Sequence, residues 1–63
     1  MTPRELDVIG LLARGLTSEE AARLLGVSPH TVKEHSKSIR LTLGARNTAH
    51  AVAIGLREGL IRP

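Results

Sequence analysis

Three helix-start signals, each followed by a glycine, divide the chain into short segments. Thr2-Pro3-Arg4-Glu5 and Thr17-Ser18-Glu19-Glu20 both have the capping-box pattern, in which a hydroxyl residue precedes a helix and a Glu follows three positions later. Ser28-Pro29 begins the third segment, where a proline in the first helical turn sacrifices no hydrogen-bond donor. A glycine then stands where each of these helices is expected to end, at Gly15, Gly26 and Gly44. These start and stop signals favour several short helices.

The rest of the pattern agrees with an all-α fold, because sustained alternation of polar and β-branched apolar residues is absent. We predict four helices at about residues 3–14, 18–25, 29–43 and 48–58, the fourth capped by Asn47 or Thr48. Leu60 and Ile61 are expected to fold back onto the core. No repeat, linker or low-complexity stretch interrupts the chain, so we expect residues 1–63 to form a single domain.

Missing residue types exclude several classes of function. The chain has no Cys, which removes disulfides, thiolate zinc sites and cysteine nucleophiles. It has no Phe, Tyr or Trp, so it offers no aromatic side chain on which unpaired bases could stack. We expect no metal, because His30 and His35 are five residues apart, about 140° around a helix, and have no partner at ligand spacing.

No nucleophile has a base and an orienting acid at suggestive spacing, so we expect no enzymatic activity, no cofactor and no small-molecule ligand. A chain of 63 residues is also too short to form a substrate pocket between two lobes. The apolar runs are all interrupted within a few residues by Arg, Glu or Gly, which argues against a membrane or targeting segment. We therefore expect a cytoplasmic protein with no membrane partner.

Positive charge is concentrated in one part of the chain. The formal net charge is +3, and residues 28–46 alone carry Lys33, Lys37, Arg40 and Arg46 against a single Glu34. At about 100° per residue, Lys37 and Arg40 lie within about 40° of Lys33 on the third predicted helix. Two apolar side chains, Val32 and Ile39, lie on the opposite side. The third helix is thus predicted to be anchored by its back and to expose a basic face that suits a polyanion.

The second and third predicted helices, with the tight turn between them, have the proportions of a helix-turn-helix unit. Ala22, Gly26 and Val32 stand where such a unit needs a small residue, a left-handed turn residue and an apolar anchor. An ordinary helical hairpin would also need these three residue types. Lys33 and Lys37 are one turn apart, which would let both reach neighbouring base edges from the major groove.

Four runs of sequence, in this order and spacing, resemble the LuxR-type, or GerE-type, DNA-binding domain of bacterial transcription regulators. They are Thr2–Glu5 (TPRE), Ala21–His35 (AARLLGVSPHTVKEH), Leu43–Asn47 (LGARN) and Ala51–Val52 (AV). The resemblance covers nearly the whole chain. It implies a four-helix domain that acts in transcription by placing its third helix in the major groove of double-stranded DNA, with the fourth helix pairing two copies.

By position, the resemblance assigns base contacts to Lys33, Glu34 and Lys37. Lys donates to guanine O6 or N7 and Glu accepts from cytosine N4, which agrees with this assignment. Glu34 has two other interpretations, as a helical partner of His30 or Ser38, or as a charge that disfavours wrong sequences by repelling phosphate. Contacts to the DNA backbone are expected from seven residues, most of them at helix starts, where hydroxyl and N–H groups suit phosphate oxygens: Thr17, Ser18, Ser28, Thr31, Arg40, Arg46 and Asn47.

The chain departs from the family pattern at the end of the third helix. The family usually has an apolar residue, a polar residue and a Lys here, whereas this chain has Arg40, Leu41 and Thr42. Leu41 is left beside the basic face, and Arg40 is expected to replace the missing cation.

For the fourth helix, we predict that Ala49, Val52, Ala53 and Leu56 face the core. A homodimer face is then expected at His50, Ala51 and Ile54. A second class of function remains open, in which the chain is an interaction module that pairs through this helix with a larger regulator. Since the first helix begins near residue 2, we expect no sensory domain ahead of it within this chain. We expect control by abundance or by a partner, or else a domain cut from a longer protein.

Overall fold

The computed structural model describes residues 1–62, and within them the chain forms four α-helices and no strand. The helices are α1 (Pro3–Ala13), α2 (Ser18–Leu25), α3 (Pro29–Leu43) and α4 (Thr48–Arg57). The all-α prediction is confirmed, and every helix begins and ends within one residue of its expected position. Pro63, the last residue of the predicted domain, lies outside the described residues.

The helix starts form as their sequences predict. In α1, the Glu5 backbone N–H donates to Thr2 Oγ1 at 3.1 Å, and the Thr2 backbone N–H donates to Glu5 Oε1 at 3.0 Å. The same reciprocal pair joins Thr17 and Glu20 at the start of α2, at 3.1 and 2.9 Å. Each capping box satisfies two backbone donors that a helix start would otherwise leave without partners.

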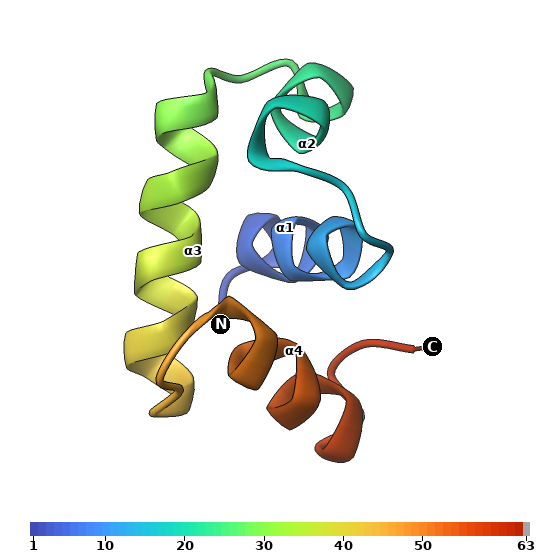
Figure 1. Ribbon diagram of the computed structural model, residues 1–63, viewed down its shortest axis with the longest axis vertical. Coiled ribbons are helices and arrows are strands. Elements are labelled where there is room, and N and C mark those ends of the chain that lie inside the picture. The colour runs from blue at the N-terminus through green and yellow to red at the C-terminus, as the bar shows by residue number, and fades with distance from the viewer. Residues whose placement is uncertain (63) are drawn as a thin grey trace.

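The longest helix, α3, runs along one side of the molecule, and the other three contact it (Figure 1). α2 lies beside the N-terminal end of α3, α1 crosses its middle, and α4 lies beside its C-terminal end (Figure 1). One side of α3 is therefore covered along most of its length. The side facing away from the other three helices is left to the solvent.

The core is built from small and β-branched side chains, as a chain without aromatic residues requires. All four helices contribute to it, and its buried members are Val8, Ile9, Ala21, Ala22, Val32, Ile39 and Ala51. Larger leucines, including Leu11, Leu12, Leu25 and Leu43, pack against this cluster while remaining half-buried. The alanines let the helix backbones approach closely, which is how a short chain fills its interior without large side chains.

The turn between α2 and α3 has the geometry that the sequence predicts. Gly26 ends α2 with φ of 70°, in the left-handed region that glycine adopts at low cost. The Val27 backbone N–H then donates to the Ala22 carbonyl oxygen at 3.0 Å, which closes the helix end. Ala22 and Val32 are both buried in the core. α2, this turn and α3 thus form a helix-turn-helix unit, carried by α1 and α4.

Of the two apolar tail residues that were predicted to fold back onto the core, one does so. Ile61 packs against the core, whereas Leu60 stays 40% exposed. Ile61 comes so close to α4 that a Cβ atom placed on Gly55 would lie 3.1 Å from Ile61 Cγ1. Gly55 thus permits a close approach between α4 and the tail.

Candidate nucleic-acid interface

The outer face of α3 exposes Lys33, Glu34 and Lys37, the three residues predicted to contact bases. Val32 and Ile39 lie on the opposite side of the helix and are buried. Within residues 1–62, neither lysine forms an ion pair. Two uncompensated ammonium groups one helical turn apart therefore project into solvent from a helix whose back is fixed in the core.

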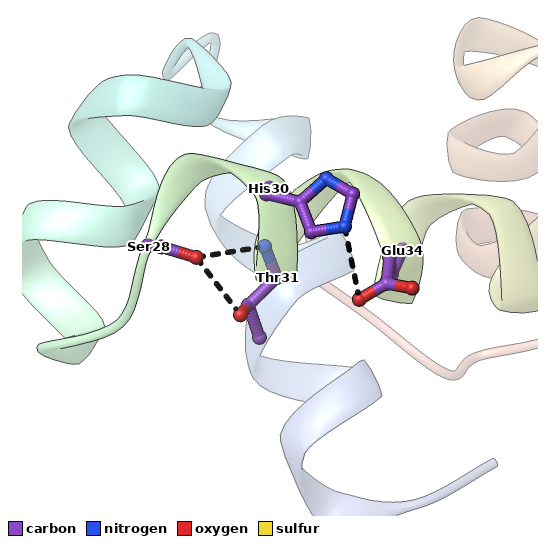
Figure 2. A network of polar contacts seen from close by, with 4 residues as sticks. All are labelled: Ser28, His30, Thr31 and Glu34. Atoms are coloured by element: carbon purple, nitrogen blue, oxygen red, sulfur yellow. Dashed lines mark hydrogen bonds and ion pairs between the residues drawn. The ribbon is translucent and has the colours of Figure 1, made fainter.

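Glu34 has a partner within its own helix. Figure 2 shows the His30 side chain turned towards it, with His30 Nε2 at 3.5 Å from Glu34 Oε1. Both side chains are largely exposed, and exposed contacts of this kind contribute little free energy. The structure thus forms the His30 contact that the sequence offered as an alternative. Since this contact is weak, the Glu34 carboxylate can leave it at little cost.

The start of α3 is closed by hydroxyl groups. Ser28 Oγ accepts from the Thr31 backbone N–H at 3.1 Å and also lies 3.0 Å from Thr31 Oγ1 (Figure 2). One hydroxyl donates to the other, which leaves one hydroxyl proton of the pair free for another acceptor. Ser28 is exposed, and Thr31 is half-buried beside it.

The start of α4 has a different cap. Asn47 Oδ1 accepts from the His50 backbone N–H at 2.8 Å, and His50 Nδ1 accepts from the Arg46 backbone N–H at 3.1 Å. The N-cap residue is thus Asn47, the first of the two predicted candidates. Arg46 and Asn47 are both exposed, and Arg46 forms no ion pair within the described residues.

The four helix starts differ in charge. The first turn of α1 contains Glu5, and that of α2 contains Glu19 and Glu20. The first turns of α3 and α4 contain no acidic residue. An anion near the start of a helix is attracted by the free N–H groups and the helix dipole unless a carboxylate already occupies that position. The starts of α3 and α4 are thus the two that keep this attraction for a bound anion.

Two serines on the flanks of α3 lie near side chains of neighbouring helices. Ser36 Oγ lies 3.3 Å from Thr48 Oγ1 in the first turn of α4. On the other flank, the Ser38 side chain lies near the Glu5 carboxylate of α1 and lowers the pKa of that carboxyl. The pKa of Glu5 lies below its ordinary value, chiefly because the Thr2 backbone N–H donates to it and also because of this Ser38 contact. Neither contact was predicted from the sequence, because both join residues far apart in the chain.

The last turn of α3 contains the segment that departs from the family pattern. Arg40 is half-buried, whereas Leu41 and Thr42 are exposed. Leu41 lies on the same face as Lys33 and Lys37, as the helical spacing predicts, and 75% of its surface is exposed to solvent.

The predicted orientation of α4 is wrong. Ala51 is 1% and Ile54 is 7% exposed, so two of the three residues assigned to a dimer face point into the core. The third, His50, is half-buried and engaged with Arg46. The exposed side of α4 instead carries residues that were expected inside: Ala49, Ala53 and Leu56. The prediction failed because most residues of α4 are apolar, so polarity did not show which side is buried.

Other features of the molecule lie away from α3. A groove of about 510 Å³ is lined by residues of α1, the end of α2 and the tail, among them Leu6, Leu11 and Ile61. The groove shares no residue with α3. A ligand bound at Lys33 and Lys37 would therefore contact the projecting helix and not this groove. Residues 1–62 contain no group of three His, Cys, Asp or Glu side chains placed to hold a metal. None of their helices has the length and apolar composition needed to cross a membrane.

These features define a helix-turn-helix domain whose longest helix exposes a basic face. The model of the family described as bacterial regulatory proteins, luxR family, matches residues 1–54. The chain belongs to this family.

Known proteins of the family resemble the chain in sequence and in structure. The chain is 39% identical over 61 residues to the transcriptional regulatory protein YdfI of Bacillus subtilis, covering 97% of this chain and 29% of that protein. It is 36% identical over 63 residues to the transcriptional activator protein BjaR1 of Bradyrhizobium diazoefficiens, covering 100% of this chain and 26% of that protein. The chain thus spans little more than a quarter of the length of these relatives.

A solved structure of the transcription factor GerE superimposes with a TM-score of 0.94 at 27% sequence identity. The superposition covers 98% of this chain and 92% of the GerE chain. The order and packing of the four helices are therefore those of an established regulator fold.

Proposed function

We propose that the domain binds double-stranded DNA in a sequence-specific manner and regulates transcription, with α3 in the major groove. The observation that supports this most directly is the pair of exposed, unpaired lysines, Lys33 and Lys37, on a helix anchored by its opposite side. A projecting helix fits the width of the major groove, and Lys donates to guanine at its edge. Glu34, released from His30, would accept from cytosine N4.

Phosphate contacts are proposed at the starts of α3 and α4. Both starts lack acidic residues in the first turn, and together they present Ser28, Thr31, Arg46 and Asn47. Arg40, half-buried in the last turn of α3, would supply a further cation. Thr17 and Ser18 remain weaker candidates, because the first turn of α2 already holds two carboxylates that repel phosphate.

Selection from a pool of random-sequence duplexes tests this function. We expect the wild-type domain to enrich one sequence, and the double variant Lys33→Ala, Lys37→Ala to lose at least about thirtyfold in affinity, since each base contact contributes about 1–3 kcal/mol. Arg14→Ala is the matched control, because it removes an exposed cation that lines the groove away from α3. The affinity should also fall with salt, with a log-log slope of roughly −3 to −5 per monomer.

Recovery of no enriched sequence would contradict the proposal, as would a double variant that binds as tightly as wild type. Amide chemical shifts then separate the alternative function. If duplex DNA leaves the α3 resonances unmoved while a larger regulator shifts those of α4, the chain is an interaction module.

We further propose that two copies pair on DNA through the exposed side of α4, at Ala49, Ala53 and Leu56. These residues recur at helical spacing, and Leu56 is 40% exposed although it is apolar. The small alanines would allow two α4 helices to approach closely, and a 63-residue domain gains specificity by reading two half-sites.

The variant Leu56→Asp tests this pairing on a palindromic duplex and on a single half-site. We expect cooperative binding to the palindrome to be lost while the affinity for the half-site stays within about twofold, since the substituted side chain lies away from α3. Leu24→Asp is the control, because it introduces the same charge at an exposed leucine of α2. Unchanged cooperativity in Leu56→Asp would exclude pairing through this face.

A further inference from the structure

Leu41 continues the row of side chains formed by Lys33 and Lys37. The three residues are spaced four apart, so they lie above one another on the same face of α3. Leu41 is 75% exposed, more than any other large apolar side chain of the described residues. The row therefore changes from two ammonium groups to one isobutyl group in the last turn of the helix.

Leu41 cannot be covered by its own domain. It lies nine residues from Val32, which places it about 180° away around the helix, and Val32 is fully buried. Its backbone is also held in place, because the Ala45 backbone N–H donates to the Arg40 carbonyl oxygen at 2.8 Å and Gly44 ends the helix with φ of 66°. The last turn of α3 is thus closed, and it presents Leu41 outward in a fixed direction.

An apolar side chain on this row has one specific target in the major groove. The C5-methyl group of thymine is the methyl group that unmodified DNA displays there, and Leu41 has no polar atom with which to recognise any other feature of a base edge. Four helical residues advance about 6 Å, which corresponds to just under two base-pair steps of about 3.4 Å. A Leu41 contact is therefore expected about two base pairs beyond the pair that Lys37 contacts.

We propose that Leu41 determines sequence specificity by packing against the methyl group of a thymine, about two base pairs beyond the Lys37 contact. This proposal rests on the proposed placement of α3 in the major groove. It assigns to the unusual leucine a part in reading the target, through an apolar contact to a base edge.

Single replacement of thymine by deoxyuridine tests the proposal, because the two bases differ only by this methyl group. Each thymine of the selected half-site is replaced in turn, and binding is measured for wild type and Leu41→Ala. The Lys37 position is located as the base preference that Lys37→Ala loses. We expect one replacement, about two base pairs from it, to weaken wild-type binding about fourfold, as for one buried methyl group.

Leu41→Ala should bind the thymine duplex about fourfold more weakly than wild type and should not distinguish thymine from deoxyuridine at that position. Leu24→Ala is the control and should keep the wild-type discrimination. Thermal unfolding of Leu41→Ala should match wild type, because the side chain is exposed.

The proposal is overturned if wild type binds its selected duplex but no deoxyuridine replacement distinguishes it from Leu41→Ala. It is overturned equally if the selected sequence has no thymine at the expected position, as would happen if Leu41 served a protein partner. In both cases sequence-specific DNA binding still stands. Failure to select any sequence would instead reject the function on which the proposal rests.

Discussion

The outer faces of α3 and α4 differ in chemistry although both helices are anchored in the same core. α3 exposes Lys33 and Lys37, whereas α4 exposes Ala49, Ala53 and Leu56. The first face attracts a polyanion from a distance and needs no shape complementarity to begin binding. The second gains free energy only when a fitting apolar surface excludes water from it. This difference supports the proposal that α3 contacts DNA and that α4 contacts protein.

The largest expected effect tests which side of α4 is buried. Ile54→Asp places an unpaired charge in the core and should cost about 3–5 kcal/mol, comparable with the whole stability of a domain of this size. Leu56→Asp should change stability by less than about 0.5 kcal/mol. Circular dichroism during thermal unfolding measures both. Equal destabilisation by the two variants would show that the orientation of α4 is wrong.

The next effect separates two roles of Asn47, which caps α4 and is proposed to bind phosphate. Asn47→Ala removes the side chain that caps α4 and should cost about 1 kcal/mol, lowering the melting temperature by about 4–8 °C. Asn47→Asp keeps the cap, so the melting temperature should hold, but its charge repels phosphate. We expect about fivefold weaker DNA binding from a repulsion near 1 kcal/mol. If Asn47→Asp binds DNA like wild type, Asn47 has no phosphate contact.

A smaller effect concerns how α3 is held. The pKa of Glu5 is lowered in the folded state, so its contribution to stability is present above about pH 4.5 and is lost as the pH falls through the folded-state pKa. The Ser36 contact to α4 involves two hydroxyl groups and does not titrate in this range. Urea unfolding between about pH 3 and 6 should therefore show a shallower acid loss in Glu5→Gln than in wild type.

Glu20→Gln is the matched control for that experiment. The pKa of Glu20 is lowered by the equivalent capping box, chiefly through the Thr17 backbone N–H, and the residue is exposed in the first turn of α2. We therefore expect Glu5→Gln, but not Glu20→Gln, to broaden the amide resonances around Ser38. An identical response in the two variants would mean that the Ser38 contact does not stabilise the position of α3.

The smallest effect tests how closely the inner side of α4 is packed. Gly10→Ala in α1 places its Cβ in open space and should stabilise the domain by about 0.5–1 kcal/mol. Gly55→Ala should gain less, because its Cβ would come within 3.1 and 3.2 Å of two Ile61 carbon atoms. Thermal unfolding of the two variants in parallel provides the comparison. An equal gain in stability at both positions would show that Ile61 moves away from the added methyl group at no cost.

The sequence predicted the face of α3 and misplaced that of α4 for a physical reason. Along α3, charged residues such as Lys33 and Lys37 alternate with apolar ones such as Val32 and Ile39 at helical spacing, so polarity shows the buried side. Along α4 most residues are apolar, so polarity does not show the buried side, which packs against α1, α3 and the tail. Contacts outside the helix decide the orientation there.

The capping boxes and turn were predictable because each depends on residues a few positions apart. The Ser36 and Ser38 contacts were not, since they join α3 to residues of α4 and α1 that the local pattern does not relate. The sequence thus identified the elements of the candidate site. Tertiary structure was needed to show what holds them in position.

The contact between Ser36 and Thr48 has a consequence for the length of DNA between two half-sites. It links α3 directly to the first turn of α4, so the helix proposed to read bases and the helix proposed to pair are packed against each other. Two copies joined through α4 would hold their α3 helices at one fixed separation. One inserted base pair would displace the second half-site by about 3.4 Å and rotate it by about 34°. The paired domains could then no longer contact both half-sites at once.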